Sequence, residues 1–409
     1  MSADAPIAFE HWLADGGLRN RPLPELFNGF TAHLVEYGVP LRRAYFGMST
    51  RHPLIQAFDM TWQPEEEKLA ETIFDHTWQQ RSAWTDSPLR HMILEHLPRM
   101  RRTLAGPRAV LDFPLFRELA ERRFTDWYGA VSGFEADSIL ERPGSLGMAC
   151  SWSSDHPAGL SDENVALIDR LFPIFAVSVK AAVMPTITRT LLGAYLGADA
   201  AQRVWSGATN RGSIERVAAA ILFSDLRGFT AFAEEASSER VMAALNRYFD
   251  SVGGAIIAEG GQILKFMGDG ILATFAQPET NVCEQALRAA LAAVRGVAAL
   301  GGEGTTGMET GGLDLGIALH KGEVLYGNVG TPERLDFTMI GPAVNEAARM
   351  EKLTKSLGCA ILASDSFQAG LDQSRGLLQP AGVHALSGLS APRALYSVLL
   401  DDKPASLKS

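Results

Sequence analysis

The second half of the chain shows two different periods in its hydrophobic pattern. Residues 217–225, VAAAILFSD, are apolar for seven positions before a polar pair, which predicts a strand buried on both faces. Residues 260–276, GGQILKFMGDGILATFA, predict a β-hairpin because Asp-Gly separates two apolar runs. Between them, Ser237 or Ser238 begins a helix whose apolar positions recur at helical spacing: Val241, Leu245, Tyr248 and Val252.

The same alternation continues towards the end of the chain. Residues 281–300, NVCEQALRAALAAVRGVAAL, predict a helix, and residues 312–330, GLDLGIALHKGEVLYGNVG, predict two strands with a turn at His320 to Gly322. Residues 341–358 predict a helix with Pro342 in its first turn and Gly358 at its end. This order of strands and helices predicts an α/β sandwich around one sheet.

The first half reads as an α+β domain. Helical spacing marks two segments, residues 23–38 and 113–124. Strand patterns mark four segments, residues 42–53, 54–63, 126–134 and 144–152. All seven tryptophans of the chain lie at or before Trp205, whereas the part after it is rich in Ala and Gly. The order of elements resembles a GAF domain, and this resemblance implies a sensory or regulatory domain.

A long helix follows, for which Ser161 is a plausible cap. Its apolar positions follow a 4-3-4-3 spacing along one face: Ile168, Phe172, Phe175, Val179 and Ala182. The stripe is typical of a helix packed on its own domain, and it also matches a parallel dimer seam that feeds the second half. Pro173 would disturb a regular coiled coil.

Composition and charge restrict the class of partner. The 409 residues are 46% hydrophobic and 21% charged, which is typical of a globular protein with two or three domains. The formal net charge of -10 argues against a nucleic-acid partner, since phosphate binding needs a basic face. Three distant cysteines, Cys150, Cys283 and Cys359, predict free thiols in a reducing compartment.

No membrane segment is expected. The N-terminus lacks a basic start followed by an apolar core, so we expect no signal peptide. The most apolar run is residues 171–187, LFPIFAVSVKAAVMPTI, which is too short for a bilayer and is interrupted by Pro173, Lys180 and Pro185. These observations predict a cytoplasmic protein without a membrane span.

Candidate chemistry lies where the strands end. Asp225 and Asp269 are 44 residues apart and each follows a predicted strand. If neighbouring strands bring the carboxylates together, a divalent cation would offset their repulsion, and oxygen ligands favour Mg²⁺ or Mn²⁺. Lys265 stands in an apolar strand, and Asn345 and Arg349 share one helix face because they are four apart. Each motif alone also has an ordinary structural explanation as a turn, a cap, an edge lysine or a solvated helix surface.

Four of these motifs together resemble one family. FSDLRGFT, LKFMGDGILATF, LGIALHKGEVLYGNVG and FTMIGPAVNEAARME match, in order and separation, the catalytic domain of class III nucleotidyl cyclases. The resemblance runs from about Val217 to Val398. It implies a ferredoxin-like α/β catalytic domain at residues 213–409, preceded by the GAF-like domain at 1–184 and a helical linker at 185–212.

The resemblance also implies the ligands of the metal. Asp225 and Asp269 match the two metal-binding aspartates of the family, and the backbone carbonyl of Leu226 is a further candidate. Two Mg²⁺ or Mn²⁺ ions would hold the triphosphate of the substrate in each active site. In the family, two catalytic domains meet head to tail and share their residues, so a homodimer is implied.

The resemblance assigns five positions to the substrate. Lys265 and Thr338 match the pair that reads the purine ring, Asn345 matches the residue that orients the ribose, and Arg349 matches the arginine at the reacting phosphate. Arg334 is a candidate for the outer phosphates. A lysine can donate to N1 of adenine, whereas guanine carries N1–H there, so Lys265 favours ATP and an adenylate cyclase.

Some positions depart from the family pattern and some alternatives stay open. Pro342 replaces the usual aspartate after glycine, and Ser387 replaces a basic residue near the last strands, for which Arg393 could compensate. Thr338 resembles a subgroup whose activity bicarbonate often stimulates. The alternatives are a guanylate cyclase and a nucleotide-binding signalling module with weak turnover. The signal at the first domain, a small molecule or a protein, is not specified.

Overall fold

The computed structural model describes residues 5–51, 53, 55–66, 68–75, 82–134, 146–276, 281–300 and 314–400. The chain forms two compact units, residues 1–194 and 195–409. Each unit has its own sheet and hydrophobic core, and each is described by itself below.

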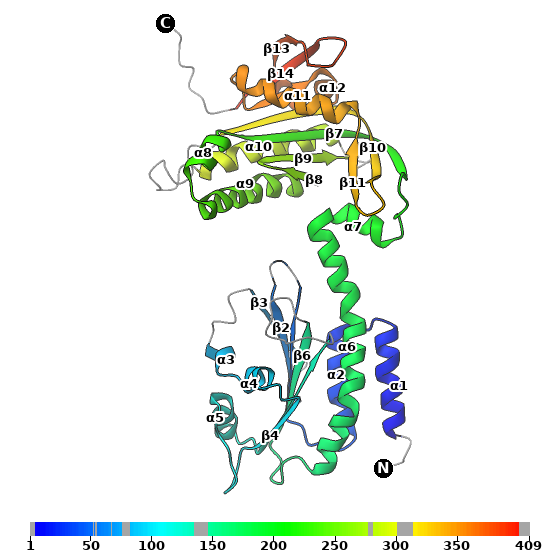
Figure 1. Ribbon diagram of the computed structural model, residues 1–409, viewed down its shortest axis with the longest axis vertical. Helices are drawn as coiled ribbons and strands as arrows, with labels where there is room; N and C mark the ends of the chain where they lie inside the picture. The colour runs from blue at the N-terminus through cyan, green and yellow to red at the C-terminus, as the bar shows by residue number, and fades with distance from the viewer. Residues whose placement is uncertain are drawn as a thin grey trace. The chain divides into compact units, whose positions relative to one another are not determined.

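The first unit contains a six-stranded antiparallel sheet in the order β3-β2-β1-β6-β5-β4 (Figure 1). Its strands are β1 (Arg43–Ser49), β2 (Ala57–Trp62), β3 (Ala70–Phe74), β4 (Arg99–Thr103), β5 (Asp126–Gly133) and β6 (Gly147–Ser154). This sheet confirms the predicted mixture of helices and antiparallel strands. The resemblance to a GAF domain stays a prediction.

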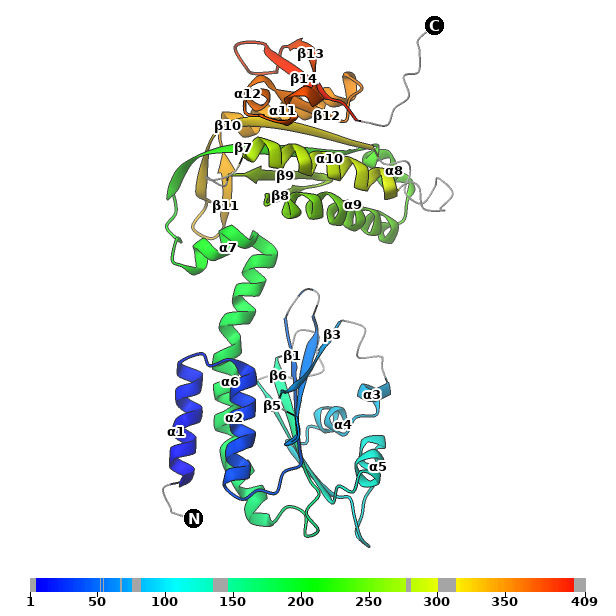
Figure 2. The ribbon, with the colours of Figure 1, turned by 180° about the vertical axis from the view of Figure 1, so that it is seen from behind.

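Helices cover both faces of this sheet (Figures 1 and 2). One face carries α1 (Ala5–Leu18), α2 (Leu23–Glu36) and α6 (Asp162–Leu196). The other face carries α3 (Ser82–Thr85), α4 (Pro88–Leu94) and α5 (Pro114–Glu121). Two separate apolar clusters result, one on each face of the sheet.

The stripe of α6 packs into its own unit. Ser161 caps the helix, because its hydroxyl accepts a hydrogen bond of 3.1 Å from the backbone N–H of Asn164. Phe175 is fully buried and stacks on Phe30 with ring centroids 4.2 Å apart. Ile168, Phe172 and Val179 are also at most 1% exposed, and Ala182 packs against the same cluster. The interpretation of this stripe as a dimer seam is therefore wrong.

The helix α6 is longer than the sequence suggested. It runs without interruption through Pro173 and Pro185 for 35 residues. By length and composition it is the one helix among the described residues that could cross a membrane, so the expectation that this segment is too short is wrong. A core helix passes the same test, and 39% of its most apolar window is buried. Pro173 itself is exposed, while Phe172 and Phe175 on either side of it are buried in the core of the unit, which holds the helix before and after the proline.

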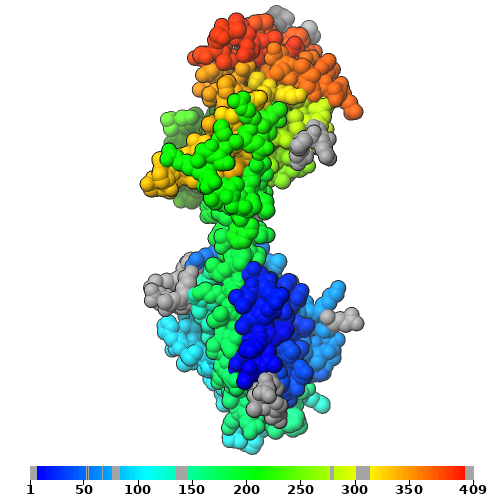
Figure 3. Space-filling view, turned by 90° about the vertical axis from the view of Figure 1, so that its right-hand side faces the viewer, coloured from blue at the N-terminus to red at the C-terminus, as the bar shows by residue number. Residues whose placement is uncertain are grey.

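The first helix is tied directly to α6. The hydroxyl of Ser178 donates a hydrogen bond of 2.7 Å to the backbone carbonyl of Leu13. Gly17 allows this close approach, because a Cβ at that position would lie 2.9 Å from Cα of Ser178. Figure 3 shows the surface of α1 lying against that of α6.

The second unit is built around an eight-stranded sheet. Seven strands follow the order β13-β14-β12-β10-β7-β9-β8, and β11 pairs with β10 outside this path. The strands are β7 (Ile214–Arg227), β8 (Gln262–Met267), β9 (Gly270–Phe275), β10 (Asp314–Gly330), β11 (Leu335–Ile340), β12 (Ile361–Ser364), β13 (Leu378–His384) and β14 (Arg393–Val398). The only parallel pair among these strands is β10 with β12.

Helices enclose the central strands of this sheet from both faces (Figure 1). The helices are α7 (Ala198–Trp205), α8 (Phe229–Glu235), α9 (Ser238–Ala258), α10 (Val282–Leu300), α11 (Pro342–Ser356) and α12 (Asp365–Ala369). The even-numbered residues Ala220 to Leu226 of β7 pack with α9 and α10. The odd-numbered Ala219 and Ile221 pack with α11, so the alternation along β7 assigns Asp225 to the α11 face.

Several predicted details are confirmed. Ser237 caps α9 by accepting a hydrogen bond from the N–H of Arg240, Pro342 begins α11, and Gly358 follows its last residues with φ of +65°. One detail is wrong, because β10 runs through His320 to Gly322 without a turn. The side chain of His320 is buried there and bonds Ser364 at 2.9 Å, while β7 pairs with β10 along its whole length.

The segment that enters this sheet is bound to β10. The carboxylate of Asp199 on α7 accepts hydrogen bonds of 2.7 Å from the hydroxyl of Tyr326 and 2.9 Å from Nε of Arg203. Arg203 also lies over the ring of Tyr326, with 5.1 Å to its centroid. Further along, the side-chain amide of Asn328 donates a hydrogen bond of 2.7 Å to the carbonyl of Ala208.

Candidate active site

Two carboxylates meet where β7 ends and the β8–β9 hairpin turns. Asp225 lies near the end of β7, and Asp269 lies in the two-residue turn between Met267 and Gly270. The turn approaches β7 closely, because a Cβ at Gly270 would lie 3.0 Å from the carbonyl of Ser224 and 3.4 Å from Oδ1 of Asp225. Asp269 therefore lies close to Asp225, as the strand ends predicted, although the turn itself is Gly268-Asp269 and not Asp269-Gly270.

The pair suits a hard divalent cation. Burial, and second the negative charge of Asp269, raise the pKa of Asp225. Among the described residues, no group of three or more His, Cys, Asp or Glu side chains could hold a metal ion. Mg²⁺ is usually bound through one or two carboxylates together with substrate phosphates and water, so this pair fits such an ion.

Leu226, the further metal candidate, offers only its backbone. Its side chain is 3% exposed and packs in the core beneath α9 and α10. Its backbone N–H donates a hydrogen bond to Asp225, which lowers the pKa of that carboxyl against the larger effect of burial. Leu226 thus orients the first aspartate, and its carbonyl stays a prediction as a metal ligand.

Lys265 reaches the same face of the sheet through a β-bulge. Ile263 pairs with Ala273, but the register then shifts and Lys265 pairs with Leu272. In a regular ladder Lys265 would lie opposite Ile271, whose side chain packs beneath α9 and α10. The bulge instead places Lys265 opposite Leu272, which packs on the α11 face with the odd-numbered residues of β7.

Lys265 is held by a residue that the sequence analysis did not single out. Its ammonium group forms an ion pair of 2.9 Å with the carboxylate of Asp336 on β11. Thr338 lies two residues further along β11 and therefore on the same face of that strand. The spacing of Asp336 from Thr338 along one strand was the signal that could have identified it. The two predicted base-reading positions thus lie on elements that contact each other.

Asn345 and Arg349 lie one helical turn apart on α11. Asn345 is exposed and Arg349 is half-buried. The guanidinium of Arg349 lies against the loop before β14, since a Cβ at Gly388 would lie 3.1 Å from its Nη2. Among the described residues no hydrogen bond or ion pair holds this guanidinium or the amide of Asn345. Both side chains are therefore available to a ligand.

The two remaining arginines have different surroundings. Arg334 is exposed at the tip of the β10–β11 hairpin, where its N–H bonds the carbonyl of Thr331 at 3.2 Å. Arg393 forms an ion pair of 2.8 Å with the buried carboxylate of Glu346. The suggestion that Arg393 replaces the missing basic residue near Ser387 therefore has no support, because its charge is already paired.

The predicted residues form separate groups within one chain. The charges that act on Asp225 are those of Asp269 and Lys352, whereas Lys265 and Arg334 act on Asp336. The predicted metal-binding pair and the predicted base-reading pair share a sheet face, but among the described residues no hydrogen bond or ion pair joins the two pairs. Arg349 belongs to neither group.

Comparison with known proteins identifies the domain in which these groups lie. Residues 213–388 match the model of a family described as the adenylate and guanylate cyclase catalytic domain. The chain carries a cyclase catalytic domain. This cyclase domain confirms the family and the sandwich fold that the motifs predicted. Its description covers both nucleotides and does not choose between them.

Relatives of the cyclase domain include named adenylate cyclases. An adenylate cyclase of Anabaena cylindrica is 39% identical over 156 residues, which are 37% of this chain and 30% of that protein. Adenylate cyclase 1 of Rhizobium meliloti is 33% identical over 183 residues, which are 44% of this chain and 27% of that protein. The matches thus span less than a third of these relatives.

Solved structures of cyclases resemble a part of the chain. A bacterial light-regulated adenylyl cyclase is 29% identical with a TM-score of 0.41, covering 45% of this chain and 91% of that one. The crystal structure of the guanylyl cyclase Cya2 is 28% identical with a TM-score of 0.40, covering 47% and 97%.

A third carboxyl lies behind the two aspartates of the cyclase domain. Glu351 of α11 is 7% exposed, and a Cβ at Gly316, the partner of Asp225 in β10, would lie 2.6 Å from its Oε1. Burial, and second the charge of Asp225, raise the pKa of Glu351 to about 7. Beside this carboxyl, Nε of Arg227 is buried and has no hydrogen-bond partner among the described residues. Sequence reasoning missed Glu351, although it is the last residue of the matched motif FTMIGPAVNEAARME, two positions after Arg349.

This carboxyl predicts a pH effect on the metal-free protein. Unfolded chains release the proton of Glu351 near its ordinary pKa of 4.5, but the folded protein retains it until about pH 7. Between these values the folded state binds more protons, so the free energy of unfolding should fall as pH rises. Urea unfolding in EDTA at pH 5, 6 and 7 measures the slope. Glu351→Gln should flatten it, and an unchanged slope in this variant would contradict the assignment.

Proposed function

We propose that the protein is an adenylate cyclase that converts ATP to 3′,5′-cyclic AMP and pyrophosphate. The observation that carries the proposal is the position of Lys265. A bulge places it on the sheet face of Asp225, and Asp336 holds its ammonium group beside the strand of Thr338. The residues predicted to recognise the base therefore lie on elements in mutual contact.

The chemistry of the purine favours adenine. An ammonium group donates hydrogen bonds only, so Lys265 suits N1 of adenine, which accepts. Guanine presents N1–H at that place, and two donors repel each other. The hydroxyl of Thr338 can accept from the exocyclic amine of adenine or donate to a ring nitrogen. A guanylate cyclase stays the second candidate because the family model covers both substrates.

Asp225 and Asp269 would hold two divalent cations, Mg²⁺ or Mn²⁺, with the carbonyl of Leu226 as a further ligand. When bound, such cations make the ribose 3′-hydroxyl more acidic and offset the charge of the triphosphate. The reaction would join the 3′-oxygen to the α-phosphorus, break the bond from that phosphorus to the bridging oxygen so that pyrophosphate leaves, and release the hydroxyl proton to water. Asn345 would orient the ribose, and Arg334 would contact the outer phosphates.

Arg349 would stabilise the charge that grows on the phosphorus oxygens in the transition state. A guanidinium is planar and permanently charged, so it matches two such oxygens at once. The absence of a competing ion pair around Arg349, among the described residues, supports this role. The residues on α11 and β8 would act on a nucleotide bound to the aspartates of a second copy, so we propose a homodimer with two sites.

The direct experiment measures product from purified full-length protein. We expect cyclic AMP from MgATP or MnATP, and at least tenfold less cyclic GMP from the matched GTP salts. Preferential turnover of GTP would overturn the interpretation of Lys265. No turnover of either nucleotide, with ATP still bound, would favour a signalling module without activity. Addition of bicarbonate at fixed pH tests the response that Thr338 suggests, and unchanged turnover would exclude it.

Asp336 provides a sharper test of base recognition. The pair with Lys265 is about half exposed, so its loss should cost about 1 kcal/mol or less, which is about fivefold in kcat/KM for ATP. Asp336→Asn should also narrow the ratio of ATP to GTP turnover, because a loosened ammonium group discriminates less. Asp250→Asn, on the exposed surface of α9, is the matched control. An unchanged ratio in Asp336→Asn would contradict the positioning role.

A further inference from the structure

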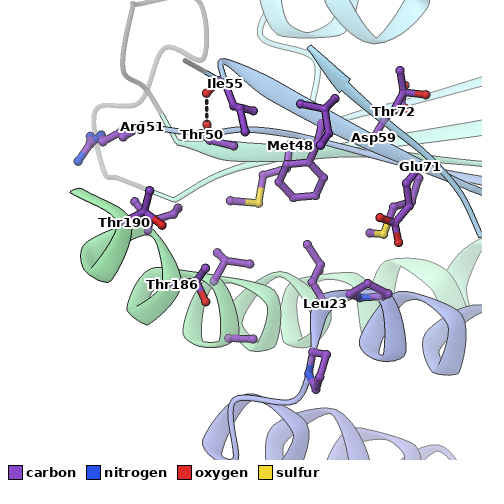
Figure 4. Close-up of a pocket in the computed structure, with 18 of the residues that line it drawn as sticks. Leu23, Met48, Thr50, Arg51, Ile55, Asp59, Glu71, Thr72, Thr186 and Thr190 are labelled. Carbon is purple, nitrogen blue, oxygen red and sulfur yellow. Dashed lines mark hydrogen bonds between the residues drawn. The ribbon is translucent and has the colours of Figure 1, made fainter. Parts of the chain in front are cut away.

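The first unit contains a cavity that the catalytic proposal does not use. It has a volume of about 560 Å³, within the range of about 300–1,000 Å³ that is typical of small-molecule sites. Its walls are the α1–α2 connection, the neighbouring strands β1, β2 and β3, and the later turns of α6 (Figure 4). It therefore lies between the sheet and the helix that continues to Leu196.

The middle of this cavity is apolar. Met48 and Phe58 form the sheet side, and Leu23, Val183 and Ile187 form the helical side. Figure 4 shows Met48 and Leu23 facing each other across the space. Nearby on β3, Ile73 also lines the cavity although 69% of its side chain is exposed. An apolar ligand that covers such open apolar surface would be stabilised by removing it from water.

The polar residues divide between the two ends. Thr50, Arg51, Thr186 and Thr190 lie together at one end, and Asp59, Glu71 and Thr72 lie at the other (Figure 4). Hydroxyls and a guanidinium supply hydrogen-bond donors and a positive charge, whereas a carboxylate only accepts. The lining therefore suits a ligand with an apolar body and an anionic group directed at the end with Arg51.

A ligand in this cavity would contact the helix α6 directly. Ala182, Thr186 and Thr190 are four residues apart, and they line the cavity from one helix face. The same helix packs through Phe175 and Val179 into the core of the unit. A ligand that touches this face adds contacts to the last turns of the helix before the second unit begins at Tyr195.

We propose that this cavity binds a small amphiphilic organic anion, such as a medium-chain carboxylate, and that its occupancy alters turnover by the cyclase domain. The binding half is independent of the catalytic activity. The coupling half rests on the proposed function. The proposal names a ligand class and a location for the signal that the sequence left unspecified.

Fluorescence of 1-anilinonaphthalene-8-sulfonate, which has an apolar body and a sulfonate, tests the binding half on the full chain. We expect one saturable site. Thr186→Phe should fill the cavity and weaken the affinity at least tenfold, whereas Thr188→Phe places the same ring on the same helix at an exposed position outside the lining. Equal affinity in both variants would overturn the site. Circular dichroism melting of both proteins controls for folding.

Charge selectivity tests the ligand class. Decanoate should displace the dye, and decylamine, which has the same chain length and the opposite charge, should not. Arg51→Gln should weaken decanoate binding at least about fivefold, with Arg51→Lys recovering part of it. Displacement by both amphiphiles alike, or an unchanged affinity in Arg51→Gln, would refute recognition of an anion.

Turnover with and without decanoate tests the coupling half. We expect at least a twofold change, in either direction, in the unsubstituted protein and in Thr188→Phe, and no change in Thr186→Phe. Saturable dye binding without any effect on turnover would refute the coupling and leave the binding supported. If no nucleotide is turned over under any condition, the proposed function and the coupling fail together, while the fluorescence result still decides the binding half.

Discussion

Replacing Asp225 by Asn should reduce cyclic AMP formation at least about a thousandfold, which corresponds to about 4 kcal/mol of transition-state stabilisation. The amide keeps the shape of the side chain but loses the charge that would hold a divalent cation. The fold should not suffer, because burial and Asp269 already raise the pKa of Asp225 and disfavour its charged form. We therefore expect equal or higher stability of the metal-free variant, measured by urea unfolding in EDTA.

Asp250→Asn is the matched control for this prediction. Asp250 lies on the exposed surface of α9, and its replacement by Asn should leave turnover unchanged. A second variant, Asp269→Asn, should lower turnover as much as Asp225→Asn. Retention of more than a tenth of the activity in either aspartate variant would contradict the assignment of this pair to the metal.

Replacing Arg349 by Ala should lower kcat about a hundredfold to a thousandfold, as removal of one charged donor at a developing oxyanion commonly does. The KM for ATP should change much less, because the interaction strengthens in the transition state. Steady-state kinetics with MgATP measures both values. Arg349→Lys should restore only part of kcat, since an ammonium group cannot reproduce the planar fork. A hundredfold rise in KM with an unchanged kcat would contradict this role.

Mixing the two inactive variants tests whether the sites are shared. If Asp225 and Arg349 act in one site from different copies, a mixed dimer of Asp225→Asn and Arg349→Ala contains one intact site. Random pairing makes half of the dimers mixed, so about a quarter of the original turnover should return. No recovery, with exchange of subunits verified by light scattering of tagged copies, would place both residues in one protomer.

Local patterns predicted much of the second unit. Ser237, Pro342 and Gly358 mark helix ends because their chemistry acts on the nearest turn of backbone. The apolar run before Asp225 predicted a central strand, and β7 is one. The wrong turn at His320 to Gly322 shows where such reasoning stops, since pairing with β7 and hydrogen bonds from Ser364 and Ser366, which are distant in the chain, hold that segment.

The site residues that escaped prediction depend on long-range pairing. Asp336 is defined by its contact with Lys265, 71 residues earlier in the chain, and that contact requires the bulge in β8. Glu351 matters because α11 packs over Gly316, which no local pattern announces. In the first unit, α1 and the charged strand β4 escaped notice because neither has a clear apolar period. These features follow from strand register and helix packing, which the hydrophobic period along the chain does not reveal.

The hydrogen bonds of Asp199 show that the second unit depends on residues that precede the family match. The family match begins at residue 213, yet Tyr326 depends on a carboxylate from α7 for its hydroxyl. A truncated protein that starts at residue 205 or 213 would lack Asp199, so the hydroxyl of Tyr326 would lose its hydrogen-bond acceptor. Tyr326 directly precedes Gly327, which pairs with Thr338. Anyone preparing the second unit alone should therefore begin no later than Tyr195, so that Tyr326, next to the residue paired with Thr338, keeps the hydrogen bond to Asp199.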